Sequence, residues 1–434
     1  MGRVYTIINA SSRLGTFTSL LENATFTQQG RTFQINYTST AVTLTDISTP
    51  VVWSGANGDR QWMTGGNWVG GIIPVANNDV VFAGVADLAP VNNNTAATAF
   101  GSITFDNTAG AFNLTGNQIT LGGGIINNSA TAQIIGMPMI CAGTQTINAA
   151  SGDITINQAI TGVGGLTKAG NSILTLSGLN AIAANNYTGT TTIDGGTLAF
   201  TATNPALTAG LIFGLAAGSA NVSALDLNTT SLTLGGALTV QTNNSSANTI
   251  AIGGGNTLTV NGNVTVGNAI HNANTVLTVS GAGTWAVNSP AGAFWLGGFI
   301  PVVNNDFNQA SLDMSGLTTF TADLTTGSLL LGRLGDNGTR SGIMRLAANS
   351  TITAATLTVG ESGSSSPVYL YLGSGSNILN VDTLNLGTGG RDSGIIAFNT
   401  GSGTLQLRDC VGTGSTNVNI QTGVGTTTGY TTDN

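Results

Sequence analysis

The feature that most constrains the fold is a four-residue phrase that occurs six times: a large apolar residue, any residue, a second large apolar residue, and glycine. The phrase stands at residues 232–235 (LTLG), 264–267 (VTVG), 294–297 (FWLG), 329–332 (LLLG), 357–360 (LTVG) and 384–387 (LNLG). Its glycines are 32, 30, 35, 28 and 27 residues apart, a quasi-period that is typical of repeat architectures. Two further strand-like runs lie between phrases, as at residues 368–372 and 378–381. Three short strands per repeat predict an all-β fold, a right-handed parallel β-helix with three strands in each coil of the solenoid.

Alternation of side chains is the physical basis of this prediction. In Leu357-Thr358-Val359 the first and third side chains point to one face of a strand and the second to the other. The inward residues of one coil cannot form a core alone, so they must stack on the neighbouring coils. The glycine that follows allows a corner with a positive φ. Helices are disfavoured because Gly, Thr and Asn dominate, and we expect a short helical excursion only at residues 206–213.

The composition limits the partners that such a solenoid can have. Only 6% of the residues are charged, the formal net charge is −8, and Lys168 is the only lysine. A basic surface for nucleic acid or anionic lipid is therefore not expected. The chain also contains no apolar run of the ~18 residues that a membrane-spanning helix needs.

Changes of pattern along the chain predict five regions. These are a short N-terminal β segment (1–45), a linker (46–50), a Trp-rich opening or cap (51–100), the parallel β-helix (101–421) and an open Gly/Thr-rich end (422–434). The first segment resembles the piece that closes a unit in long bacterial surface proteins, so we expect it to be the tail of a preceding unit. The first residues lack the layout of a signal peptide, which indicates that the signal was removed or that the chain is part of a longer one.

Three tryptophans in the opening region are the candidate contact residues for a glycan or a partner. Trp53, Trp62 and Trp68 lie within sixteen residues of one another, and flat aromatic faces suit the stacking of sugar rings. The alternative, which we favour, is a hydrophobic plug that covers the first edge of the solenoid.

Groups that could perform catalysis are scarce. The single histidine, His271, has no accompanying Gly-x-Ser-x-Gly elbow, and we interpret it as a turn residue. Parallel β-helix lyases and glycosidases gather carboxylates on one face, but this chain has only two glutamates and scattered aspartates. The best cluster, Asp306, Asp336, Glu361 and Arg333 on successive loops, is a conceivable calcium site but is more simply a set of solvated turn residues. We therefore expect no catalytic residues, no metal and no cofactor.

The two cysteines are interpreted as separate thiols. With a rise of ~4.8 Å per coil, Cys141 and Cys410 would lie roughly 40 Å apart, which excludes a disulfide between them. Two buried thiols are the preferred interpretation, and an intermolecular bridge is the alternative.

The most specific passage is GLTKAG at residues 165–170, LTLSG at 174–178, NYTG at 186–189 and TIDGGTL at 192–198. It resembles the autotransporter-associated β-strand repeat, also called the passenger-associated transport repeat. The opening Trp53-Ser54-Gly55, Trp62 and Asn67-Trp68 is similar to openings in autotransporter-like proteins. The resemblance implies a secreted or surface-displayed parallel β-helix. The chain departs from the family pattern in two places. Residues 179–185 predict a bulging loop, and the C-terminus resembles neither a strand that ends in an aromatic residue nor a β-barrel translocator.

These inferences predict an extracellular, non-enzymatic structural solenoid on a bacterial surface, a stalk or fibre that associates with itself end to end into filaments. An adhesin or carbohydrate-binding passenger domain is the alternative, with extracellular matrix or glycans as partners. A polysaccharide lyase is a third and weaker alternative.

Overall fold

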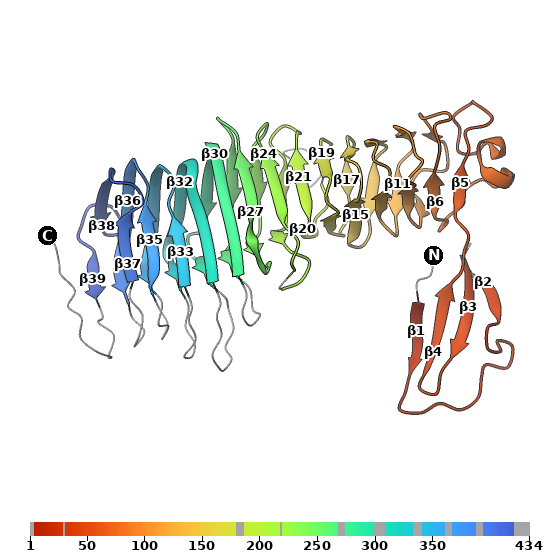
Figure 1. Ribbon diagram of the computed structural model, residues 1–434, viewed down its shortest axis with the longest axis horizontal. Coiled ribbons are helices and arrows are strands. Elements are labelled where there is room, and N and C mark those ends of the chain that lie inside the picture. The colour runs from red at the N-terminus through yellow and green to blue at the C-terminus, as the bar shows by residue number, and fades with distance from the viewer. Residues whose placement is uncertain are drawn as a thin grey trace. The chain divides into compact units, whose positions relative to one another are not determined.

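The computed structural model describes residues 4–28, 31–178, 186–217, 219–267, 274–297, 309–332, 341–360, 367–387 and 394–420 (Figure 1). The chain forms two compact units, residues 1–164 and residues 165–434. Among the described residues the only helical segments are two short 3-10 turns, η1 (Gly65–Asn67) and η2 (Val69–Gly71). The all-β prediction is therefore confirmed.

The first unit begins with a small antiparallel sheet. Its strands are β1 (Val4–Asn9), β2 (Thr25–Gln28), β3 (Arg31–Tyr37) and β4 (Ala41–Asp46), in the order β1-β4-β3-β2. Ile35 and Val42 are buried in this sheet, whereas every residue of the edge strand β1 is exposed. The red strands in Figure 1 show this sheet next to the label N.

Parallel coils occupy the rest of the first unit. Their strands are β5 (Val51–Trp53), β6 (Val80–Phe82), β7 (Val91–Asn92), β8 (Thr98–Phe100), β9 (Ile103–Phe105), β10 (Asn113–Gly116), β11 (Ile119–Leu121), β12 (Ile125–Asn127), β13 (Gln133–Gly136), β14 (Met139–Cys141), β15 (Gln145–Ala149), β16 (Ile154–Ile156) and β17 (Ile160–Thr161). Parallel pairing starts at β5, which pairs with β6. Val51, Val80, Ile103, Ile125 and Ile147 align in one column of buried side chains. This column shows how the core grows by stacking one apolar residue from each coil.

The second unit has three faces, each a ladder of parallel strands. Face 1 contains β19 (Ile173–Leu176), β21 (Gly196–Phe200), β24 (Ser223–Leu227), β27 (Asn244–Ile252), β33 (Ser341–Arg345), β35 (Val368–Leu372) and β37 (Gly394–Phe398). Face 2 contains β22 (Ala206–Leu207), β25 (Leu232–Leu234), β28 (Thr257–Val260) and β38 (Thr404–Arg408). Face 3 contains β18 (Leu166–Ala169), β20 (Thr191–Asp194), β23 (Leu211–Phe213), β26 (Leu238–Val240), β29 (Val264–Val266), β31 (Ala293–Leu296) and β39 (Asn417–Ile420).

Four long strands of this unit bend around corners and so belong to more than one face. They are β30 (Asn274–Asn288), β32 (Gln309–Leu331), β34 (Asn349–Val359) and β36 (Ser376–Leu386). Successive parts of β32 pair with both halves of β30 and then with β31. Figure 1 shows the green to blue strands of this unit as a ladder that ends at β39. The second unit is thus a parallel β-helix with three strands per coil, as predicted.

Five of the six phrases stack on one another on face 3. Their first residues, Val264, Phe294, Leu329, Leu357 and Leu384, are in register from coil to coil and buried. The phrase at residues 232–235 is different, because it lies in β25 on face 2. The face 3 residue in register with Val264 is Leu238. The periodicity therefore predicted the coil correctly but assigned its first repeat to the wrong strand.

The backbone angles separate the same five phrases from the sixth. Their glycines have φ of 146° (Gly267), 133° (Gly297), 72° (Gly332), 82° (Gly360) and 64° (Gly387). This is the region that side-chain-bearing residues rarely adopt, so glycine is required at the corner. Gly235 is not among the glycines with a positive φ.

The expectation of a helical excursion at residues 206–213 is wrong. This stretch forms β22 and β23, whose Leu207 and Leu211 pair with Leu234 and Leu238 of the next coil. A hydrophobic run this short does not distinguish a buried strand from a helix, and pairing with a coil 27 residues away decides the outcome. The last described coil consists of β37, β38 and β39, which pair with β35 and β36.

Candidate functional site

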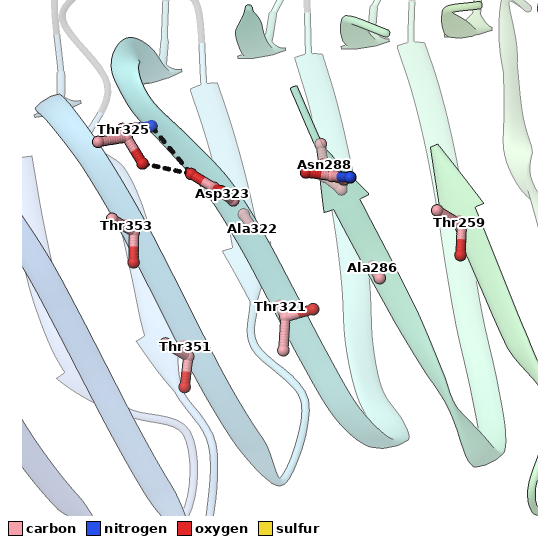
Figure 2. A pocket seen from close by; sticks show the side chains of 10 residues that line it. Thr259, Ala286, Asn288, Thr321, Ala322, Asp323, Thr325, Thr351 and Thr353 are labelled. Atoms are coloured by element: carbon pink, nitrogen blue, oxygen red, sulfur yellow. Dashed lines mark hydrogen bonds between the residues drawn. The ribbon is translucent and has the colours of Figure 1, made fainter. Parts of the chain in front are cut away.

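A shallow groove lies on face 2 of the second unit. It has a volume of about 470 Å³ and crosses four coils, from β28 through β30 and β32 to β34 (Figure 2). Threonine hydroxyls line it, with Thr259, Thr321 and Thr351 in one column. The hollow arises where this column contains Ala286, whose methyl group fills less space than the side chains on either side.

One carboxylate and one amide complete the groove. Asn288, Asp323 and Thr353 form the second column, in register across three coils. Thr325 donates from its backbone N–H and from its hydroxyl to Oδ1 of Asp323, as Figure 2 shows. The groove thus offers hydroxyl, amide and carboxylate groups that can hydrogen-bond to a polyhydroxyl ligand. Alternating Thr residues in the sequence indicated an outward face, but only the coil register brings these groups together.

The three candidate tryptophans lie inside the first unit. Trp53, Trp62 and Trp68 are 1%, 0% and 2% exposed. The ring centroids of Trp53 and Trp68 are 5.0 Å apart and those of Trp62 and Trp68 are 5.8 Å apart, both pairs being edge to face. Phe82 packs against all three. In this arrangement the indole faces contact other rings, which is the geometry of an aromatic core and leaves no ring face open to a sugar.

A charged junction joins the N-terminal sheet to the first coils within unit 1. Arg31 Nε donates to Asp46 Oδ2 at 2.6 Å, Nη2 donates to Asp79 Oδ2 at 2.8 Å, and Nη1 donates to the carbonyl of Asn77 at 2.7 Å. Ser48 and Ser102 each donate from N–H and hydroxyl to the remaining oxygen of Asp46 and of Asp79. The linker at residues 46–50 is therefore held at its first residue, Asp46, by the ion pair with Arg31.

The protonation of these groups follows from their surroundings. Burial raises the pKa of Asp46, but the hydrogen bonds from Ser48 and Arg31 outweigh burial and hold this pKa below its usual value. Asp79 behaves in the same way: burial opposes the hydrogen bonds from Arg31 and Ser102, and the net pKa is lowered. Burial also lowers the pKa of Arg31, but the two carboxylates raise it by more. All three groups are charged at neutral pH.

Lys168 is a buried cation inside the second unit. Its side chain is 0% exposed, and Nζ donates to the carbonyls of Ala169 (2.9 Å), Gly170 (2.7 Å) and Gly195 (2.9 Å). Gly195 follows β20, the strand that pairs with the strand of Lys168. The ammonium group therefore ties the corners of two successive coils. Sequence reasoning noted the lone lysine but missed this role. The available signal for it was the position of the lysine near corners that contain glycine.

The cysteines are both free thiols. Cys141 is buried, and burial raises its pKa to about 11. Cys410 is half-buried, and a hydrogen bond to Asp382, together with burial, raises its pKa. The prediction of buried thiols is thus correct for Cys141 and only partly so for Cys410.

Several sequence candidates lie outside the described residues. They are His271, the proposed cluster of Asp306, Arg333, Asp336 and Glu361, and the predicted loop at residues 179–185. Within the part of the chain that the structure describes, no group of three or more His, Cys, Asp or Glu side chains is arranged to hold a metal ion. A helix of sufficient length and hydropathy to cross a membrane is likewise absent from that part.

Comparison with known proteins identifies the repeat and one relative. Residues 166–200, which include Lys168, match the family model of the passenger-associated transport repeat. The chain is 34% identical over 168 residues to the Adhesin BmaC autotransporter of Brucella suis biovar 1 (strain 1330). The aligned region covers 37% of this chain and 5% of the relative. The chain thus spans about a twentieth of that relative's length. No solved structure matches the chain.

The predicted resemblance to the autotransporter-associated repeat is confirmed by these matches. Together with the parallel β-helix, they indicate an extracellular or cell-surface protein.

Proposed function

We propose that this chain is a section of a non-enzymatic, extracellular structural β-solenoid, a surface stalk or fibre that associates end to end into filaments. The observation that carries the structural role is the unbroken apolar column of face 3, in which Leu211, Leu238, Val264, Phe294 and Leu329 succeed one another fully buried. Stacked coils of this kind give stiffness because every coil is hydrogen-bonded to the next along three ladders.

The support for self-association comes from two sheet edges that pair with no further strand among the described residues. In the last described coil, Phe398, Leu407 and Val418 pair in register with the buried Leu372, Leu379 and Leu384, yet they are 41%, 36% and 46% exposed. In the described part of unit 1, β1 is an edge strand that pairs with β4, and it exposes all its side chains. Unpaired strand edges are templates for strand addition. A contact between two different edges is heterologous and extends as an open filament.

Electron microscopy of the purified chain over a range of concentrations tests filament formation. We expect filaments whose length increases with concentration, and we expect Leu407→Lys with Val418→Lys to abolish them, because charges in the exposed core positions oppose stacking. Asn288→Lys, which adds one positive charge at an outward position of the groove, is the control and should leave filaments intact. Separate particles at every concentration would contradict the filament.

An adhesive or carbohydrate-binding passenger domain is the second candidate. It is supported by the similarity to a protein named as an adhesin and by the hydroxyl-lined groove on face 2. A glycan array and a cell-binding assay with the monomeric Leu407→Lys, Val418→Lys variant test it apart from filament formation. Binding by that variant supports adhesion, and binding to no glycan, matrix protein or cell contradicts it.

A further inference from the structure

Two tyrosines on face 1 form an aromatic pair that the roles above do not use. Tyr369 and Tyr371 alternate with the buried Val368, Leu370 and Leu372 of β35, so both side chains point outward and are half-buried. Their ring centroids are 5.4 Å apart and the ring planes differ by 1°. Two parallel rings on the outside of a sheet expose amphipathic surface, which is a common component of binding sites.

A cation from the preceding coil extends this pair. Arg345 of β33 is in register with Tyr371, and its guanidinium carbon lies 5.2 Å from the centre of that ring. The guanidinium group of Arg345 has no hydrogen bond and no ion pair with any described residue. Its register neighbour on the other side, Asp313, instead accepts hydrogen bonds at Oδ1 from the N–H and hydroxyl of Ser315. The N–H donors of Arg345 are therefore available to an anion, and a planar guanidinium suits a carboxylate.

The backbone around the pair decides what kind of ligand can bind. β33 pairs with β32 and β35, and β35 pairs with β33 and β37, so both strands are flanked on two sides. An extended peptide cannot add a strand here, because strand addition needs an open sheet edge. Recognition must come from side chains. A compact, rigid ligand with an apolar C–H face for the rings and a carboxylate for Arg345 meets this requirement.

We infer that Tyr369, Tyr371 and Arg345 form a binding site for an acidic saccharide, that is, a glycan unit that carries a carboxylate. Because Tyr371 stacks on Tyr369 and lies under the Arg345 guanidinium, the sugar's C–H face packs on the free face of the Tyr369 ring and on the outward edge of Tyr371. Its carboxylate accepts hydrogen bonds from Arg345. Ser311, which points outward and is in register with Ile343 of β33, supplies a hydroxyl at the border of the site, and Asp313 borders Arg345 in the other column. The inference rests on the adhesive candidate function and specifies its ligand class and location.

Calorimetric titration of the full chain with trigalacturonic acid tests the site. Its fully methyl-esterified form removes the negative charge but keeps the sugar rings, and hexaglutamate supplies carboxylates without sugar. We expect trigalacturonic acid to bind at least about tenfold more tightly than the ester, because hydrogen bonds to charged groups are the stronger ones. Equal affinity for the acid and the ester, or tighter binding of hexaglutamate, would overturn the inference.

Variants of the three site residues distinguish binding at this site from binding elsewhere on the chain. Arg345→Gln should lower affinity for the acid to that for the ester, and Tyr369→Leu with Tyr371→Leu should weaken both. Tyr5→Leu, which changes an exposed tyrosine of the N-terminal sheet, is the matched control and should have no effect. Circular dichroism of each variant checks the fold. If the wild type binds and all site variants bind equally well, the site is wrong although adhesion stands; if the wild type binds no saccharide, the ligand class is wrong.

Discussion

Lys168 shows how a single residue can hold two coils together. A lysine with no exposed surface must replace its hydration shell, and three carbonyl oxygens within 2.9 Å do so here. Because the carbonyl of Gly195 belongs to the following coil, the bond acts between coils. The lysine lies within the segment that matches the passenger-associated transport repeat, so this cation is part of how that segment folds.

Replacing Lys168 by methionine should therefore destabilise the second unit. Methionine fills a similar volume but donates no hydrogen bond, which leaves three carbonyls without this donor. We expect a loss of about 3 kcal/mol in the free energy of unfolding, measured by urea denaturation followed by circular dichroism. Thr192→Val, at a half-exposed position on the paired strand, is the control and should change stability by less than about 0.5 kcal/mol. Equal stability of the methionine variant and the wild type would show that the three bonds contribute nothing.

The junction around Arg31 should be sensitive to acid. The pKa values of Asp46 and Asp79 are lowered in the fold from 3.8, so the stability that they contribute is fully present above that pH and is lost as the pH falls through the folded values. We expect the N-terminal sheet to detach from the coils of unit 1 below about pH 4, seen as faster hydrogen exchange of β3 and β4 than of β9 and β12.

At neutral pH the same effect should follow from Asp79→Asn, which removes one charge from the junction. Thermolysin should then cut residues 47–50 several times faster than in the wild type, because the ion pair between Arg31 of the sheet and Asp79 of the coils is lost. Asp226→Asn, at an outward position of β24 in unit 2, is the control. Unchanged cleavage in Asp79→Asn would mean that the ion pair does not hold the sheet.

At the scale of elements, the inward column of face 3 is the main source of stability. Leu357 lies between Leu329 and Leu384 in this column and is 0% exposed. The part of each strand that lies on face 3 is short, has the alternating burial typical of a half-buried strand, and contributes one or two large inward residues. A strand of this length is not stable alone, and its stability comes from the side chains above and below it.

Leu357→Ala should thus cost about 2–5 kcal/mol, the usual range for a leucine deleted from a core that cannot collapse around the cavity. Thr356→Ala, on the same strand at a half-exposed position, should change stability by less than about 0.5 kcal/mol. Denaturation midpoints of the two variants make the comparison. Similar losses in both would contradict the assignment of the alternating faces.

Sequence patterns predicted the elements better than their partners. The phrase at residues 264–267 was assigned correctly as a strand with a glycine corner, since both are local properties. The phrase at 232–235 has the same local pattern but lies on another face, because the face is set by pairing with β28. The prediction of a helical excursion at residues 206–213 is wrong for the same reason, because the strand conformation there depends on pairing with the neighbouring coils.

At the scale of the whole molecule, the two units are each a one-dimensional stack. With 6% charged residues, long-range electrostatic interactions contribute little, and contacts between neighbouring coils dominate. A local defect should therefore have local consequences.

Hydrogen exchange of the Leu357→Ala variant tests this expectation. Amides of β32, β34 and β36 should exchange faster than in the wild type, whereas those of β12 and β15 in the first unit should be unchanged. Acceleration of exchange throughout the chain would show that it unfolds as one cooperative unit instead.

The sequence by itself determined the class of fold, the strand alternation, the glycine corners and the resemblance to a surface-protein repeat, because each of these is encoded within about thirty consecutive residues. Only the tertiary structure decided which residues meet across coils. It buried Trp53, Trp62 and Trp68 against one another, enclosed Lys168 among carbonyls of two coils, and placed Arg345 beside Tyr371. The contacts of Trp53 with Trp68, of Lys168 with Gly195 and of Arg345 with Tyr371 join residues 15 to 27 positions apart. Their register depends on the exact length of each intervening turn, which local patterns do not specify.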